Sequence, residues 1–275
     1  MIERFSPAKV NLGLSVLGRR ADGYHQLHTL FAALDVGDRI ALEPVPQGVH
    51  LEVRGADLPT GPGNLAYRAA QAYLEAAGNP GGVRMLLEKR LPVAAGLGGG
   101  SGNAATVLLG LRQLYPAPLD LFPIARALGA DVPFFLRGGL AEARGIGEVL
   151  SPLEPLRLHL VLVNPGLAVS ATEAYQVTKP DDYAPELPVA AILAALKGGE
   201  EPPWWNSLEA PVFRLRPELA ELKAALRAFG LRGVLMSGSG STFLALASDP
   251  AQAQHLAARL RERFPRFWIR PAQSA

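Results

Sequence analysis

The fold of this chain is decided by one stretch, Pro92-Val-Ala-Ala-Gly-Leu-Gly-Gly-Gly-Ser-Gly-Asn-Ala-Ala105, in which five glycines lie between Gly96 and Gly102. The segment from Asn103 to Leu114 has the spacing of an amphipathic helix, with an apolar face formed by Val107, Leu108, Leu111 and Leu114. A glycine-rich loop at a helix start exposes backbone N–H groups, and the helix dipole is positive there. The stretch therefore predicts a phosphate-binding loop; a flexible linker or close helix–sheet packing is the alternative.

The loop does not match the common phosphate-binding motifs. A P-loop requires Lys and then Ser or Thr directly after its last glycine, and this pair is absent here. A dinucleotide fingerprint fits better, because Gly98 to Gly100 open a helix and Asp120 follows at about the expected distance. However, Asp120 ends the segment Tyr-Pro-Ala-Pro-Leu-Asp, which indicates a helix start rather than a strand end. We therefore expect a third design of phosphate loop.

Composition limits the classes of function. The 275 residues are 49% hydrophobic and 19% charged, enough for one large domain or two modest ones. The formal charge is only +2, without a dense Lys/Arg run, so nucleic acid is not required as a partner. The absence of cysteine excludes disulfides, thiolate zinc sites and cysteine nucleophiles. Without an apolar signal core or a membrane-length apolar run, we expect a soluble cytoplasmic protein.

The first strand carries a candidate anion-binding lysine. Residues 5–17 alternate in polarity, so Lys9 and Asn11 share a face about 7 Å apart. A lysine among small polar residues can reach an anion, although a solvated outer face is equally compatible. The turn after this strand ends in Tyr24 and His25, which can stack on and hydrogen-bond a flat heterocycle or belong to an ordinary loop. His25 and His28 could share a helical face, and we expect a surface pair rather than a metal site.

The rest of the first half supplies elements around the glycine-rich stretch. Residues 39–43 and 49–54 predict a hairpin, and Asn64 is expected to cap a helix that runs to Ala77. The strand 83–91 leads into the loop. Asp120 opens a short helix that ends at Gly129, and a further hairpin is expected over 138–150. Between that helix and the hairpin lies Asp131, beside bulky apolar residues. Asp131 is either a carboxylate with a tuned pKa or a turn residue bonded to its own backbone.

The second half predicts an α+β sandwich of the ferredoxin type. Residues 151–155 indicate a boundary. Strands are expected at 156–162, 233–236, 242–247 and 267–270, with helices between them. Ser170 or Thr172 caps a short helix that holds Tyr175, and Trp204-Trp205-Asn206 is expected to be a packed anchor. The segment Ser237-Gly-Ser-Gly-Ser241 is either a second glycine loop that faces a phosphate or a tight turn between two strands.

Four segments together resemble a known superfamily. They are Pro7-Ala-Lys-Val-Asn-Leu12, Asp22-Gly-Tyr-His25, the loop from Pro92 to Ala105, and Ser237-Gly-Ser-Gly240. The chain is similar over essentially its whole length to the GHMP kinases, named for galactokinase, homoserine kinase, mevalonate kinase and phosphomevalonate kinase. The first two segments are specific to members that phosphorylate a CDP-linked methylerythritol, whereas the glycine loop marks only the superfamily.

The resemblance implies a two-domain fold and a reaction. It implies an N-terminal domain like domain 2 of ribosomal protein S5 over residues 1–152 and a ferredoxin-like domain over residues 153–275, with the site in the cleft between them. It implies transfer of the γ-phosphate of ATP to the 2-hydroxyl of the CDP-linked methylerythritol, in the non-mevalonate isoprenoid pathway. Mg²⁺ is expected to arrive with ATP. We expect no nucleic-acid or membrane partner and a monomer or weak homodimer.

The motif match also assigns residues. Lys9 and Asp131 become the catalytic pair, with Asp131 as the base. Substrate contacts fall to Asn11, Tyr24, His25, Tyr175, Gly238 and Ser239. ATP contacts fall to Asn64, Leu65, Val93, Ala94, Ala95, Gly96, Leu97, Gly98, Gly99, Gly100, Ser101, Gly102 and Asn103.

One position departs from the family pattern. The family usually has Gly-Gly-Gly-Ser-Ser-Asn-Ala-Ala, and Gly102 replaces the second Ser here. The metal ligands are therefore open, with Ser101 as the available hydroxyl. The alternatives are a homoserine or mevalonate type of kinase, disfavoured by the Asp-Gly-Tyr-His turn, and a dinucleotide-dependent oxidoreductase, disfavoured by Asp120. A catalytically silent nucleotide- or RNA-binding module is disfavoured by the presence of both Lys9 and Asp131.

Overall fold

The computed structural model describes residues 1–274, which fall into two compact units. Unit 1 contains Met1–Ala8, Val36–Val93 and Gly98–Gly138, and unit 2 contains Lys9–Asp35, Ala94–Leu97 and the chain from Gly139 onward. The first two strands run through both units, and the glycine-rich stretch is shared between them.

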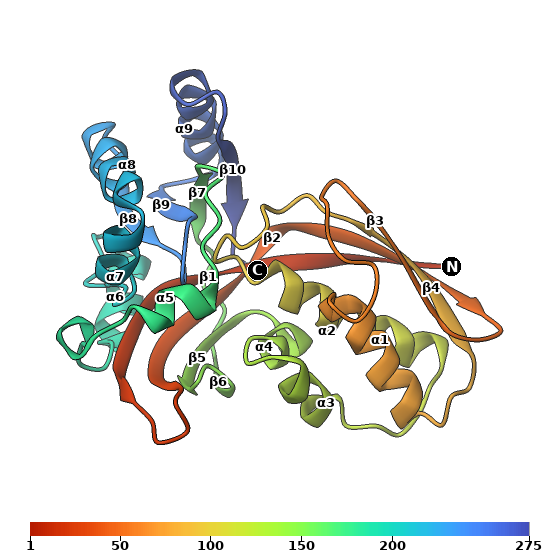
Figure 1. Ribbon diagram of the computed structural model, residues 1–275. Coiled ribbons are helices and arrows are strands. Elements are labelled where there is room, and N and C mark those ends of the chain that lie inside the picture. Colours follow the sequence, from red (N-terminus) through yellow and green to blue (C-terminus); the bar gives the residue numbers. More distant parts are fainter. Residues whose placement is uncertain (275) are drawn as a thin grey trace. The chain divides into compact units, whose positions relative to one another are not determined.

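The elements are labelled in Figure 1. The strands are β1 (Ile2–Arg19), β2 (His25–Val45), β3 (Val49–Arg54), β4 (Gly82–Glu88), β5 (Leu140–Gly145), β6 (Val149–Leu153), β7 (His159–Asn164), β8 (Arg232–Met236), β9 (Phe243–Ala247) and β10 (Trp268–Gln273). The helices are α1 (Leu65–Ala76), α2 (Gly99–Leu114), α3 (Leu121–Leu128), α4 (Val132–Arg137), α5 (Ala171–Gln176), η1 (Pro180–Asp182), α6 (Val189–Gly198), α7 (Glu209–Leu215), α8 (Pro217–Ala228) and α9 (Pro250–Arg263). None of the helices within residues 1–274 has the length and apolarity to cross a bilayer.

Unit 1 is a sheet with helices α1 to α4 on one side (Figure 1). In this unit β4 lies between β3, which it pairs in parallel, and β2, which it pairs antiparallel. The expected inward face of β4 is confirmed, since Val83, Met85 and Leu87 are buried. Asn64 and Asp120 cap α1 and α3 as predicted, with side-chain oxygens that accept from the N–H groups of Ala66 and Phe122.

The predicted hairpin of residues 39–43 and 49–54 is wrong. The two segments are β-strands, but β4 lies between them. The register joins Val49 to Val83 and Val45 to Gly82. The physical reason is burial. β4 carries four buried residues and takes the position between the two strands, whereas β3 alternates between half-buried and exposed residues and suits the sheet edge.

Helix α2 begins at Gly99, four residues before the predicted start. Its N-cap residue, Gly98, has a left-handed φ of 66°, which a glycine adopts without strain. The helix is buried on almost every side, so the single apolar face expected from the sequence understates its position in the core. Small residues permit this: a Cβ at Gly110 would lie 2.9 Å from the Leu42 side chain.

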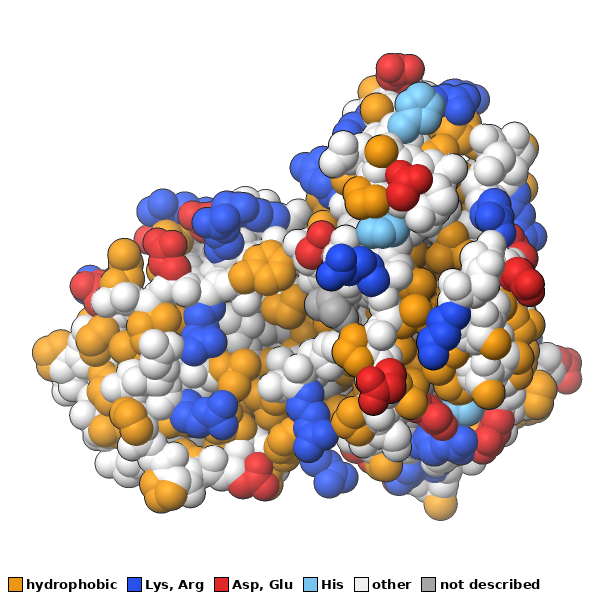
Figure 2. Space-filling view, turned by 180° about the vertical axis from the view of Figure 1, so that it is seen from behind, with side chains coloured by type: hydrophobic (Ala, Val, Ile, Leu, Met, Phe, Trp, Pro, Cys, Tyr) orange, Lys and Arg blue, Asp and Glu red, His pale blue; other side chains and the backbone are white. Residues whose placement is uncertain are grey.

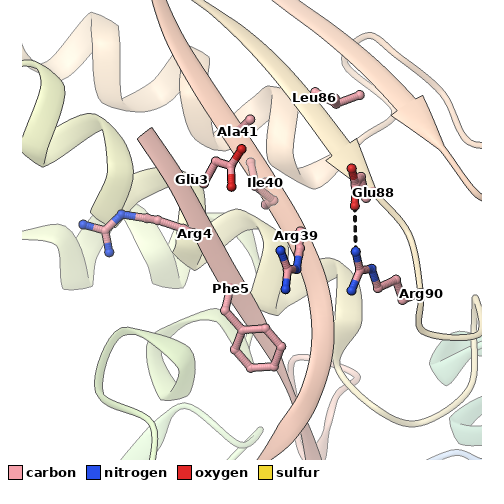
Figure 3. Close-up of a pocket in the computed structure, with 9 residues that line it drawn as sticks. All are labelled: Glu3, Arg4, Phe5, Arg39, Ile40, Ala41, Leu86, Glu88 and Arg90. Atoms are coloured by element: carbon pink, nitrogen blue, oxygen red, sulfur yellow. Dashed lines mark hydrogen bonds and ion pairs between the residues drawn. The ribbon is translucent and has the colours of Figure 1, made fainter. Parts of the chain in front are cut away.

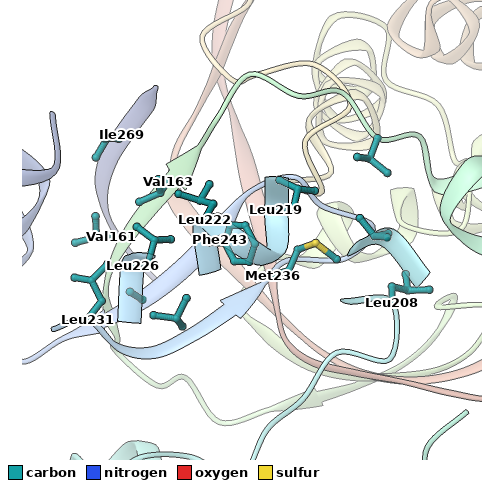
Figure 4. Close-up of a cluster of buried hydrophobic side chains, with 14 of the residues drawn as sticks. Val161, Val163, Leu208, Leu219, Leu222, Leu226, Leu231, Met236, Phe243 and Ile269 are labelled. Atoms are coloured by element: carbon teal, nitrogen blue, oxygen red, sulfur yellow. The ribbon is translucent and has the colours of Figure 1, made fainter. Parts of the chain in front are cut away.

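Unit 2 contains the predicted ferredoxin-type sandwich. Its four-stranded antiparallel sheet has the order β10-β7-β9-β8, which is the order of a ferredoxin-like βαββαβ fold. Figure 4 shows the core, in which Leu222 and Leu226 of α8 belong to one cluster with Val161, Val163 and Phe243 of the sheet. The same cluster includes Leu14, Val16 and Leu27 of β1 and β2. The predicted hairpin over 138–150 is confirmed as the antiparallel pair β5–β6.

Candidate functional site

The carbonyl oxygens of the glycine-rich stretch in unit 2 all face protein donors. Those of Ala94, Ala95 and Leu97 accept from the backbone N–H groups of Val169, Thr242 and Lys9, at 3.1, 3.2 and 3.0 Å. The Gly96 carbonyl accepts from the Ser237 hydroxyl at 3.0 Å. Carbonyl dipoles repel anions, so this arrangement turns the unfavourable groups of the loop toward the protein.

Glycine is required at two positions of the stretch. Gly96 has a φ of 75°, and a Cβ there would overlap the carbonyl oxygen of Ser237. A Cβ at Gly102 would lie 2.6 Å from the carbonyl oxygen of Pro7. A Ser at this position would therefore need a shift of α2 or β1, which gives Gly102 a structural reason. Ser101 is half-buried on the first turn of α2.

A buried polar network underlies the start of α2 in unit 1. Asp38 is fully buried and pairs with the ammonium of Lys89. Its other oxygen accepts from the N–H groups of Arg90 and Leu91, at 2.8 and 3.0 Å. Asn103 donates to Asp38 at 2.9 Å and accepts from Lys89 at 3.3 Å. This network fixes the strand that enters the loop to the helix that leaves it.

Lys9 and Asn11 share a face of β1, as predicted, but this face is buried. The exposed fractions are 4% for Lys9 and 1% for Asn11, so the solvated alternative is excluded. The Lys9 ammonium donates to Asn11 Oδ1 at 2.7 Å and lies 4.9 Å from the centre of the Phe31 ring. The Asn11 amide in turn donates to the Thr29 hydroxyl at 2.7 Å. A buried ammonium held among polar groups can stabilise a transferring phosphoryl group.

The second glycine turn is bound to this cluster. The Ser237 hydroxyl accepts from the backbone N–H of Asn11 at 3.1 Å. A Cβ at Gly238 would lie 3.1 Å from Asn11 Oδ1 and 3.5 Å from Lys9 Nζ. The side chain of Asn206 donates to the carbonyls of Met236 and Gly238. Within unit 2, the structure therefore brings together Lys9, Asn11, Gly96 and Gly238. Ser239, the residue after Gly238, is half-buried.

His25 lies in an aromatic environment within unit 2. Its ring stacks on Tyr175, with centroids 5.4 Å apart and planes 22° apart, and meets the edge of Tyr183 at 6.1 Å. The buried Nε2 atom of His25 has no hydrogen-bond partner within the described chain. Burial, together with the positive charge of Arg19, lowers the pKa of His25 from its ordinary value of 6.5. The lowered pKa favours the neutral form of the imidazole. The neighbouring Tyr24 is largely exposed.

His28 is not part of a surface pair. It lies in β2 and is buried, so the expectation of a helical face is wrong. Its Nδ1 accepts from the N–H of Leu187 at 3.0 Å, which leaves the ring proton on Nε2, 2.9 Å from Glu142. Within residues 1–274, no group of three His, Cys, Asp or Glu side chains is arranged to hold a metal ion.

Three further predicted residues, Asn64, Leu65 and Asp131, belong to unit 1. The side-chain amide of Asn64 is engaged at both ends, by the N–H of Ala66 and the carbonyl of Pro59, and Leu65 lies 3.5 Å from the Cβ position of Gly100. Asp131 is half-buried at the N-cap of α4, and its side chain does not cap that helix. Lys9 belongs to unit 2 and Asp131 to unit 1, so their pairing stays a prediction.

Sequence reasoning missed several contributors. Thr29, Tyr183 and the Asp38–Lys89 pair received no role, and Asn206 was expected only as a packing anchor. One usable signal was present for Thr29, which is a polar residue inside the apolar run Leu27-His-Thr-Leu-Phe-Ala-Ala-Leu34. Polar groups buried in such a run need hydrogen-bond partners and therefore mark networks.

A separate hollow of about 390 Å³ lies on unit 1 and contains no predicted site residue. It is lined by Glu3, Arg4, Phe5, Arg39, Ile40, Ala41, Leu86, Glu88 and Arg90. Figure 3 shows Arg90 paired with Glu88 at one side of it. On the face in Figure 2, acidic and basic side chains are interspersed, in keeping with the small net charge.

Comparison with known proteins identifies relatives over the whole chain. Residues 64–139 match the family model of the GHMP kinases N terminal domain, and residues 192–266 match GHMP kinases C terminal. The 4-diphosphocytidyl-2-C-methyl-D-erythritol kinase of Thermus thermophilus is 60% identical over 94% of this chain and 93% of its own length. The enzyme of the same name from Deinococcus radiodurans is 52% identical over 98% and 92%. A crystal structure of 4-(cytidine 5'-diphospho)-2C-methyl-D-erythritol kinase, 58% identical, superposes over 100% of both chains with a TM-score of 0.91.

Proposed function

The chain belongs to the 4-diphosphocytidyl-2-C-methyl-D-erythritol kinases, a family of GHMP kinases, and we propose that it phosphorylates the 2-hydroxyl of that CDP-linked alcohol with ATP. The products are the 2-phosphate and ADP, and the step belongs to the non-mevalonate route to isoprenoid precursors. The observation that carries the choice of a cytidine substrate is His25, whose buried Nε2 lacks a partner beside the stacked ring of Tyr175.

The glycine-rich stretch is assigned to ATP. The backbone N–H groups between Gly96 and Asn103 hold the β- and γ-phosphates, because the neighbouring carbonyls are bonded to the protein and the positive end of α2 lies there. Adenine contacts are assigned to Leu65 and to the backbone of Asn64, since the Asn64 amide is already engaged. The flanking Val93, Ala94 and Ala95 complete the nucleotide contacts.

Lys9 and Asp131 are assigned to the phosphoryl transfer. A loose transition state needs positioning and charge stabilisation more than covalent chemistry. The Lys9 ammonium stabilises negative charge on the transferring group, and Asp131 accepts the proton of the substrate hydroxyl. Asn11 and Gly238 hold the sugar alcohol. The Ser101 hydroxyl would be the available side-chain ligand for a Mg²⁺ ion bound with ATP, which would keep most of its waters and would supply neutralisation of phosphate charge.

The cytosine is assigned to the aromatic cluster. A neutral imidazole presents one donor and one acceptor to a pyrimidine edge, while Tyr24 or Tyr175 stacks on its face. We further propose a cytoplasmic monomer or weak homodimer without nucleic-acid or membrane partners, built from domains over residues 1–152 and 153–275.

A coupled ADP-release assay tests this function. We expect turnover with the CDP-linked methylerythritol and little with homoserine or mevalonate. Asp131→Asn should lower kcat about 10²- to 10⁴-fold, the usual contribution of a general base, with KM for ATP near that of the wild type. Preferred turnover of homoserine or mevalonate would reject the substrate, and an active Asp131→Asn variant would reject the base.

A further inference from the structure

Thr29 of β2 is hydrogen-bonded to the cluster on β1 at two points. Its hydroxyl donates to the carbonyl of Gly13 at 2.6 Å and accepts from Asn11 Nδ2 at 2.7 Å. Thr29 and Asn11 are each 1% exposed. Solvent therefore has little access to replace either bond, and all of these residues belong to unit 2.

The direction of these bonds is fixed by chemistry. A hydroxyl has one proton, and a carbonyl oxygen can only accept. The Thr29 proton is therefore committed to Gly13, and Thr29 can only accept a bond from Asn11. The part of the Asn11 amide that faces Thr29 must be its NH₂ group, so the orientation of this amide follows from the network itself.

The same orientation decides what the Lys9 ammonium meets. With the NH₂ group turned to Thr29, Asn11 Oδ1 faces Lys9 Nζ at 2.7 Å. A reversed amide would present N–H groups to the ammonium, and neither could accept. The backbone N–H of Asn11 is held separately, by the Ser237 hydroxyl. The bond to Thr29 therefore acts on the side chain of Asn11, where it prevents rotation of the amide group.

We propose that Thr29 is a positioning residue that orients the Asn11 amide and thereby fixes the Lys9 ammonium for phosphoryl transfer. The inference rests on the roles proposed above for Lys9 and Asn11. Thr29 itself acts through Asn11.

Substitutions of nearly equal shape separate this role from simple packing. Thr29→Val keeps the branched side chain that suits a strand and removes the hydroxyl, whereas Thr29→Ser keeps the hydroxyl. We expect Thr29→Val to lower kcat about 10- to 100-fold, the factor for one buried hydrogen bond left unmade. KM for ATP should be unchanged, and Thr29→Ser should retain most of the wild-type kcat.

Ser207 provides a matched control. Its hydroxyl is also buried and accepts from the β1 backbone, at the N–H of Val16, 3.1 Å away. Ser207→Ala should lower the unfolding temperature and leave kcat near the wild-type value. In an Asn11→Ala background, Thr29→Val should change kcat by less than about 2-fold, because a residue that acts through Asn11 has nothing left to orient.

The outcomes distinguish this inference from the proposed function. If the wild-type enzyme does not use the CDP-linked substrate, the proposed function is rejected and the role of Thr29 falls with it. If the wild type is active and Thr29→Val matches its kcat, only the role of Thr29 is rejected. An equal loss in Ser207→Ala, or an additive loss in the Asn11→Ala background, would show that Thr29 acts through general stability instead.

Discussion

Replacement of Asp38 by Asn should strongly destabilise unit 1. The carboxylate of Asp38 is fully buried and accepts hydrogen bonds from Lys89, Asn103 and two backbone N–H groups. An Asn side chain has one acceptor oxygen, so its NH₂ group must face donors on one side. The variant therefore leaves the nearly buried ammonium of Lys89 without its counter-charge.

The size of the effect follows from this uncompensated charge. Removal of one partner of a buried ion pair costs about 3–5 kcal/mol, against a total stability of about 5–15 kcal/mol for a typical protein. Asn103 lies near the start of α2, as its fifth residue, and loses the acceptor of one of its bonds. We therefore also expect KM for ATP to rise several-fold at temperatures where Asp38→Asn is still folded.

Urea unfolding followed by far-UV circular dichroism measures the stability. Hydrogen exchange of peptides from β4 and α2 shows whether the loss lies in unit 1. The exposed pair of Glu52 and Arg54 is the control, and Glu52→Gln should change stability by less than about 1 kcal/mol. The double variant Asp38→Asn/Lys89→Met should be more stable than Asp38→Asn alone. A loss under about 1 kcal/mol in Asp38→Asn would refute the reasoning.

Two further outcomes concern the loop and the aromatic cluster. Gly102→Ser should lower the melting temperature because the new Cβ would lie 2.6 Å from the carbonyl oxygen of Pro7. Gly100→Ser is the control and should leave the melting temperature unchanged, since the nearest neighbour of its Cβ is Leu65 at 3.5 Å. Equal melting temperatures of the two variants would contradict this. As pH falls, the unfolded chain takes up a proton on His25 before the folded chain does, because the pKa of His25 is lowered in the folded chain. The contribution of His25 to the free energy of unfolding is therefore complete above pH 6.5 and is lost as pH falls below it. Because the pKa of His25 in the folded chain lies below 6.5, KM for the CDP-linked substrate should stay constant through pH 6.5 and rise only at lower pH, and a rise that begins above pH 6.5 would argue against a neutral His25.

Local features of the sequence were sufficient for much of the fold. The caps at Asn64 and Asp120 were predicted, and Ser170 was one of two candidates for the cap of α5, because capping depends on residues two or three positions apart. The four strands of the ferredoxin-type sheet were recognised from local alternation and turn residues. The pairing of residues 49–54 was not, because the choice between β2 and β4 depends on which strand is buried at the centre of the sheet.

What the sequence determined by itself is a glycine-rich loop that opens a helix, a lysine and an asparagine on one strand face, and an α+β chain of the GHMP kinase family. Only the tertiary structure decided that this face is buried and which groups hold it. Asn11 is joined to Ser237 across 226 positions, and Asp38 to Lys89 across 51. Hydrogen bonds of this kind depend on where distant segments meet in space, whereas periodicity and capping record only the neighbours of each residue along the chain.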